Sequence, residues 1–84
     1  MPIPELEARV KQILTNRLGI PAEEIRTDAK LVEELGMDSL DAVELAIATE
    51  REFKVELSDQ QVATLQTVAD IMALVQRLHD EYRV

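Results

Sequence analysis

The sequence contains no cysteine and no tryptophan, and it has only one histidine, one phenylalanine and one tyrosine. Without cysteine there is no disulfide framework and no thiolate metal site, and a single histidine cannot form a histidine cluster around a metal. Because aromatic residues make up only 2% of the chain, the core has to be built from aliphatic side chains and methionine. Disulfide-stapled and metal-centred small domains are therefore excluded.

Long apolar runs are also missing from the chain. No run approaches the ~20 apolar residues that a membrane-spanning helix needs. The first residues, MPIPELEARV, lack the basic start and the apolar stretch of a signal peptide. We therefore expect a cytoplasmic protein with no membrane span.

Positive charge is scarce, with nine basic residues against 17 acidic ones and a net charge of -8. This balance argues against binding to nucleic acid, whose phosphates attract basic surfaces. Residues 33–59 contain nine acidic and two basic residues, whereas the rest of the chain contains eight and seven. A solvated acidic face would explain this charge, but its concentration in one segment favours a docking surface for basic proteins. We expect the protein to be a monomer.

Apolar residues recur at steps of three and four, which predicts an all-α fold for residues 1–84 as a single domain. The first helix is expected over residues 4–18, with Gly19 as its left-handed cap. Its apolar stripe consists of Ile3, Leu6, Val10, Ile13 and Leu14. The last helix is expected to begin after Thr67. Its stripe consists of Val68, Ile71, Met72, Val75, Leu78 and Tyr82.

Between these helices the sequence predicts one further main helix and one short one. The main helix starts at Asp38 or Ser39 and ends near Phe53, and Ser58 or Asp59 caps the short helix. Residues 19–37 form a long connection with a short helical turn in IPAEEI, and we expect it to be packed by its own side chains. Its apolar anchors are Ile20 and Ile25, and Leu31, Val32 and Leu35 are further apolar contacts. The whole is a small four-helix bundle.

The helix that begins near Ser39 carries two apolar stripes when its residues are placed at about 100° intervals. The natural core face consists of Ala42, Leu45, Ala46, Thr49 and Phe53. The second stripe is Leu40, Val43 and Ile47, with Asp41 and Glu44 on one side and Glu50 on the other. Either the helix is buried on two sides, or the second stripe is an exposed binding strip. The flanking acids favour the strip, because unpaired buried carboxylates are very costly.

Ser39 lies in the run LGMDSLDAVEL, directly after Asp38, a good N-cap with Asp41 three residues on. A nucleophilic serine needs a base, and the only histidine, His79, is expected to be a surface residue of the last helix. There is no G-x-S-x-G motif, no glycine-rich phosphate loop and no complete calcium loop. We therefore expect neither an enzyme nor a metal site. A serine at a helix N-terminus is, however, well placed to carry a phosphodiester.

The run LGMDSLDAVEL, together with LVEE before it and EREF and TVADIM after it, resembles the acyl carrier proteins of bacterial fatty-acid synthesis. The resemblance covers essentially the whole chain. It implies that Ser39 receives a 4′-phosphopantetheine arm from coenzyme A through a separate phosphopantetheinyl transferase. The thiol of that arm carries acyl groups as thioesters, which family members shelter inside the helical bundle.

The resemblance also implies a docking surface for acyl-processing enzymes with basic patches. Acids after the serine meet Arg and Lys of those partners, and apolar residues contact them between the acids. The expected docking residues are Asp38, Leu40, Asp41, Val43, Glu44, Ile47 and Glu50.

Some positions depart from the pattern of the family. Met37 stands where alanine is frequent, Glu34 replaces a common aspartate, and Arg51 replaces an acid. The stretch LSDQQVAT also lacks a proline and dense acids. A carrier for a polyketide, peptide, D-alanine or other specialised pathway is therefore an open alternative. An unmodified acidic helical adaptor is a further one.

Overall fold

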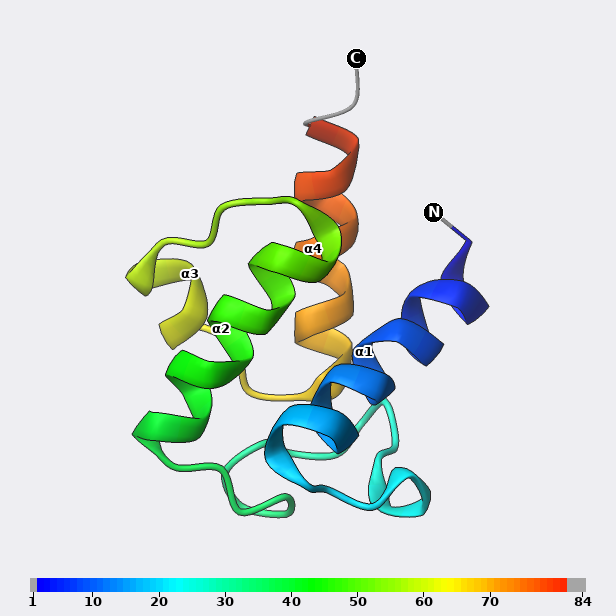
Figure 1. Cartoon of the computed structure of the whole chain (residues 1–84), viewed down its shortest axis with the longest axis vertical. Helices are drawn as coiled ribbons and strands as arrows, with labels where there is room; N and C mark the ends of the chain where they lie inside the picture. The colour runs from blue at the N-terminus through cyan, green and yellow to red at the C-terminus, as the bar shows by residue number, and fades with distance from the viewer. Residues whose placement is uncertain (1, 82–84) are drawn as a thin grey trace.

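The structure is a computed structural model that describes residues 2–81. It contains four α-helices, namely α1 (Ile3–Leu18), α2 (Ser39–Phe53), α3 (Asp59–Ala63) and α4 (Val68–Glu81). α1 runs antiparallel to α2 and α4, and the short α3 lies to one side (Figure 1). The start of α1 and the end of α4 lie at one end of the molecule, and the start of α2 lies at the other. The predicted arrangement of three main helices and one short helix is confirmed.

Local signals in the sequence account for the helix ends. Gly19 has a φ of 71° and ends α1, and its N–H donates to the Thr15 carbonyl. The Ser58 hydroxyl accepts the Gln61 N–H at 3.1 Å and starts α3. At the start of α4, the Thr67 hydroxyl accepts the N–H of Asp70 at 3.2 Å, and the Asp70 carboxylate accepts the N–H of Thr67 at 3.0 Å. The predicted caps are therefore confirmed.

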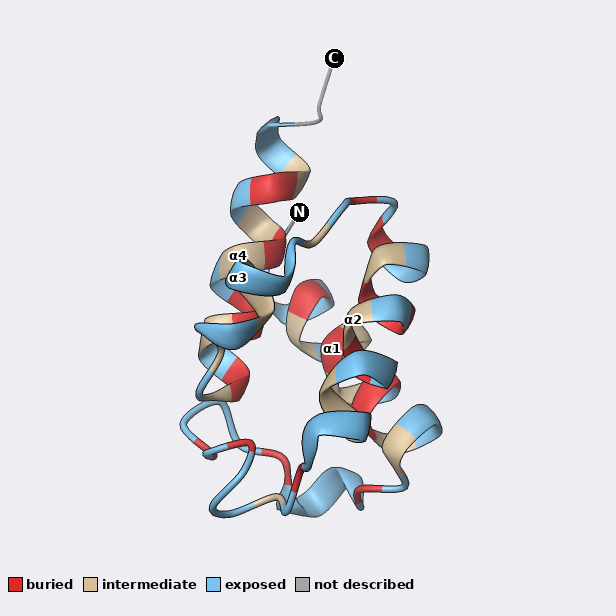
Figure 2. Cartoon of the chain, turned by 90° about the vertical axis from the view of Figure 1, so that its left-hand side faces the viewer, coloured by how far each residue is buried: buried red, intermediate tan, exposed pale blue. Residues whose placement is uncertain are grey.

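The buried side chains form one core, and Phe53 is its only aromatic member among the residues described. Both predicted stripes face this core, and Figure 2 shows buried positions recurring along the inner sides of the helices. Ile3 is a correction, because its side chain is 57% exposed. It is the first residue of α1, one turn before Leu6, where the bundle no longer covers the helix. The expected stripe residue Tyr82 lies outside the described residues.

The connection between α1 and α2 is packed by its own side chains, as predicted. It contains a 3₁₀ turn, η1 (Ala22–Glu24), within IPAEEI. Backbone hydrogen bonds attach it to the start of α4, from the Leu31 N–H to the Gln66 carbonyl and from the Ala69 N–H to the Thr27 carbonyl, both at 2.8 Å. Its buried side chains are Ile20, Ile25, Ala29, Leu31 and Met37. The segment that leads to Ser39 is therefore held against the bundle.

One of the predicted apolar contacts of this connection behaves differently. Val32 is 66% exposed, so its assignment as a packing residue was wrong, whereas the half-buried Leu35 packs against the core as predicted. Val32 lies in a turn in which its carbonyl accepts the N–H of Gly36, and Leu31 beside it points into the core. Adjacent residues in such a turn cannot both face inward. In the described residues, no helix has the length and apolar character to cross a membrane.

Candidate functional site

The start of α2 is fixed by reciprocal hydrogen bonds between two aspartates. The Asp38 carboxylate accepts the N–H of Asp41 at 2.9 Å, and the Asp41 carboxylate accepts the N–H of Asp38 at 3.2 Å. This capping box, with Asp38 as the cap, was expected from the sequence. It leaves Ser39 as the first residue of the helix, exposed at the end of the molecule where α2 begins (Figure 1).

The polar groups around Ser39 are available to a ligand. Within residues 2–81, nothing hydrogen-bonds to the Ser39 hydroxyl or to the backbone N–H groups of Ser39 and Leu40. Free N–H groups at the positive end of a helix favour an anion, so these atoms fit a phosphodiester on the serine oxygen. His79 lies near the end of α4, at the opposite end of the molecule, and cannot act as a base for this serine.

Met37 precedes the capping box and anchors the chain rather than crowding the serine. Its side chain is buried in the core, and its N–H donates to the Leu31 carbonyl at 2.9 Å. Gly36 before it has a φ of 74°, a conformation that favours glycine. The turn at Gly36 therefore directs Met37 inward while Ser39 stays at the surface.

The second stripe of α2 is exposed. Leu40, Val43 and Ile47 have exposed fractions of 78%, 57% and 43% and lie along one face of the helix. The alternative of a helix buried on two sides is therefore wrong. An apolar strip on an otherwise acidic surface is typical of a protein contact site, and we call these three residues the apolar strip.

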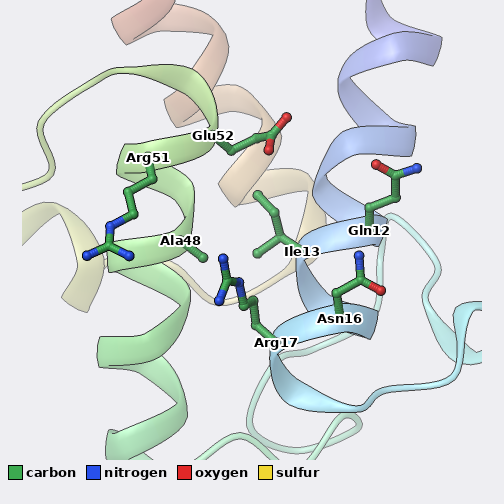
Figure 3. Close-up of a pocket in the computed structure, with 7 residues that line it drawn as sticks. All are labelled: Gln12, Ile13, Asn16, Arg17, Ala48, Arg51 and Glu52. Atoms are coloured by element: carbon green, nitrogen blue, oxygen red, sulfur yellow. The ribbon is translucent and has the colours of Figure 1, made fainter.

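The opposite face of α2 packs on the core, with one shift from the prediction. Leu45, Thr49 and Phe53 are buried as expected, but Ala42 and Ala46 are only half-buried. Ala48, which the sequence did not assign to the core, is buried where α1 packs against α2. Figure 3 shows its methyl group pointing toward Ile13. Compared with the prediction, the buried face of α2 is thus rotated toward α1, because the contact with α1 determines which α2 residues are covered.

The acids around the apolar strip differ in what they already contact. Asp38 and Asp41 are engaged in the capping box, whereas the exposed side chain of Glu44 forms no hydrogen bond or ion pair with another described residue. The Glu50 carboxylate accepts the N–H of Leu57 at 2.9 Å. Glu50 therefore connects the last turn of α2 to the segment that leads into α3.

A cleft of about 300 Å³ lies between α2 and α3, directly beside the apolar strip. Its walls are largely small or aliphatic side chains. They are Ala42, Val43, Ala46, Ile47, Glu50, Leu57, Asp59, Val62 and Ala63. The sequence did not locate this cleft, because it depends on how the two helices pack.

On the other side of α2, a groove of about 410 Å³ separates it from α1 (Figure 3). Its lining residues are Gln12, Ile13, Asn16, Arg17, Ala48, Arg51 and Glu52. Arg9 bridges the two helices, because its guanidinium lies 2.8 Å from the Glu52 carboxylate and 4.6 Å from the centre of the Phe53 ring. We call this the α1–α2 groove. The described residues contain no group of three metal-ligating side chains.

Comparisons with known proteins agree with this geometry. The family model described as "Phosphopantetheine attachment site" matches residues 8–75. An acyl carrier protein of Akkermansia muciniphila is 40% identical over 73 residues, covering 87% of this chain and 91% of its own. An acyl carrier protein of Solidesulfovibrio magneticus is 42% identical over 73 residues, covering 87% and 94%.

The crystal structure of an acyl carrier protein from Thermotoga maritima superposes with a TM-score of 0.85 at 25% identity. The match covers 96% of this chain and 94% of the other. Acyl carrier proteins are carriers rather than enzymes, and they work with acyl-processing enzymes. With a family model over most of its length and two close relatives, the chain belongs to the acyl carrier protein family and is an acyl carrier with a 4′-phosphopantetheine prosthetic group.

Proposed function

We propose that Ser39 is the residue that bears the 4′-phosphopantetheine arm. The observation that supports this most directly is the exposed serine at the start of α2, with its hydroxyl and two adjacent N–H groups free of other described residues. The flexible arm ends in a thiol that carries acyl groups as thioesters, a chemistry that the chain has no cysteine to supply. The N–H groups of Ser39 and Leu40 stabilise the phosphodiester.

Intact-protein mass after incubation with coenzyme A, magnesium and a broad-specificity phosphopantetheinyl transferase tests this proposal. We expect the wild type to gain one phosphopantetheine and Ser39→Ala to gain none. The variant should fold normally, with a free energy of unfolding within about 0.5 kcal/mol of the wild type, because the exposed hydroxyl forms no hydrogen bond with a described residue. Loading of Ser39→Ala would refute the assignment. Failure to load correctly folded wild type, with a transferase that is active on another carrier, would also contradict the proposal that Ser39 is the attachment site.

We propose further that the protein works in fatty-acid or specialised lipid synthesis, as a cytoplasmic monomer. The docking surface for the transferase and for acyl-processing enzymes is the exposed face of α2. It consists of Asp38, Leu40, Asp41, Val43, Glu44, Ile47 and Glu50. Its exposed apolar strip and surrounding carboxylates suit partners with basic patches around an apolar centre. A net charge far from zero favours a dispersed monomer.

The cleft between α2 and α3 is the natural shelter for the acyl chain in this proposal. It is lined by alkyl groups and lies beside the same face of α2 that begins at Ser39. Polyketide, peptide and D-alanine pathways remain alternatives for the cargo. Mass spectrometry of the protein isolated from its own cells, loaded in vivo, identifies the acyl group and separates these pathways.

A further inference from the structure

Most of the described basic side chains of this acidic protein form ion pairs with carboxylates, but a few do not. The nitrogen–oxygen distances in these ion pairs are 2.8 to 3.7 Å. Among the residues that the structure describes, Arg17, Arg51 and Lys54 form no ion pair. Two of these three, Arg17 and Arg51, line the α1–α2 groove.

The groove therefore brings together two basic side chains that no carboxylate of the described residues neutralises. Its one acidic residue, Glu52, is already held by Arg9, which donates to both its carboxylate and its backbone carbonyl. Figure 3 shows Arg17 extending from α1 into the space between the helices, and Arg51 extending from the outer side of α2. Gln12 and Asn16 add amide donors. Guanidinium groups bind carboxylates strongly, often with two parallel hydrogen bonds.

The groove is continuous with the proposed docking surface. Arg51 follows Ile47 by four residues and Glu44 by seven, so all three lie along one face of α2. The docking surface thus carries Asp41 and Glu44 in the first half of α2, and an unpaired arginine joins Glu50 in the last turn. A partner patch that is basic throughout would meet this arginine with a charge of the same sign.

Helix electrostatics explain only part of this arrangement. Arg17 and Arg51 each lie in the last turn of their helix, where the negative end of the helix dipole stabilises a cation. That stabilisation explains why an arginine is tolerated at each helix end. It does not explain why both arginines line the same groove beside the apolar strip.

We propose that the α1–α2 groove binds acidic side chains of the partner enzyme, so that the partner's docking patch has basic groups opposite Asp41 and Glu44 and acidic groups opposite Arg51 and Arg17. This inference rests on the proposed docking function of α2 and adds to it the charge pattern of the partner. Arg51 and Arg17 then select against partners whose patch is uniformly basic.

The chemistry of the groove is tested by titrating ¹⁵N-labelled protein with tricarballylate, a small tricarboxylate. We expect saturable shifts of the backbone amides of residues 12–17 and 48–52. Arg17→Gln and Arg51→Gln should each weaken binding by about threefold, as for an exposed charge pair, and the double variant should weaken it by about tenfold. Arg77→Gln, which removes an exposed arginine from α4, is the matched control and should bind as the wild type does.

The charge pattern of the partner is tested with two synthetic helical peptides that share one apolar face. One peptide carries lysine throughout its polar face, and the other carries lysine at one end and glutamate at the other. We expect the Arg17→Gln, Arg51→Gln double variant to bind the mixed-charge peptide more weakly and the all-lysine peptide more tightly than the wild type does.

Unchanged peptide affinities in the double variant, or tricarballylate shifts that are absent or spread over all surface cations, would overturn the inference. Neither experiment requires phosphopantetheine on the protein. Failure of the transferase to load Ser39 and failure of the α1–α2 groove to bind carboxylates are therefore separate results.

Discussion

At the scale of single residues, the acids near Ser39 are chemically alike, but their side chains contact different groups. Glu50 was assigned to the docking surface with Glu44, yet its carboxylate already holds the Leu57 N–H. Leu57 lines the cleft between α2 and α3, so this hydrogen bond holds one wall of the proposed shelter for the acyl chain. The sequence could not indicate this contact, since seven residues and the end of a helix separate its partners.

Hydrogen exchange at the Leu57 amide distinguishes these two roles of Glu50. Glu50→Ala removes the acceptor, so the Leu57 N–H should exchange at least about fivefold faster, as expected for losing a hydrogen bond worth about 1 kcal/mol. Glu50→Gln removes the charge but keeps an acceptor oxygen and should exchange much as the wild type does. Equal, unchanged exchange in both variants would show that Glu50 serves only at the surface.

At the scale of helices, most of the fold follows from local signals. The caps at Asp38, Ser58 and Thr67 and the glycine at residue 19 lie where the sequence predicts them, because each depends on residues only a few positions apart. The errors, at Ile3, Val32 and Ala48, concern burial. Burial depends on which neighbouring helix covers a residue, and local periodicity does not contain that information. The same reason hides the α1–α2 groove, to which two helices contribute.

A matched pair of serine variants tests the importance of capping for the short helix α3. Ser58→Ala removes the side-chain acceptor for the Gln61 N–H and should lower the free energy of unfolding by about 1 kcal/mol. Ser39→Ala makes the same chemical change at the start of α2, where Asp38 is the cap, and should have less than half that effect. Urea denaturation followed by circular dichroism measures both. Equal losses of unfolding free energy in the two variants would mean that the capping hydrogen bond of Ser58 does not stabilise the protein.

At the scale of the whole molecule, the acidic charge is concentrated around α2, and the proposed docking depends on this charge. Nine of the 17 acids lie between residues 33 and 59, around α2. The negative electrostatic field of these acids accelerates encounters with a positively charged surface. Salt screens this field beyond a distance of about 10 Å at 0.1 M ionic strength. The sequence alone predicts this asymmetry, because it depends only on composition along the chain.

Association with a basic probe enzyme, the phosphopantetheinyl transferase, should reveal this field. Glu44→Lys should slow association by about tenfold at low salt, with little effect at high salt and no loss of stability, since the exposed Glu44 side chain forms no hydrogen bond or ion pair with another described residue. Asp41→Lys should slow association as well but also destabilise α2, because Asp41 belongs to the capping box. Stopped-flow fluorescence at several salt concentrations gives these rates. Rates for Glu44→Lys that match the wild type at low salt would contradict electrostatic docking.

The arrangement of the helix ends has a practical consequence. α1 begins and α4 finishes at the end of the molecule that is farthest from Ser39 (Figure 1). A fluorescent label, an affinity tag or a fused enzyme joined to either of these helix ends is therefore kept away from the serine. Immobilised in this way, the protein would present Ser39 and the exposed face of α2 to the solution, so that many copies on one support could be loaded and unloaded by enzymes flowing past.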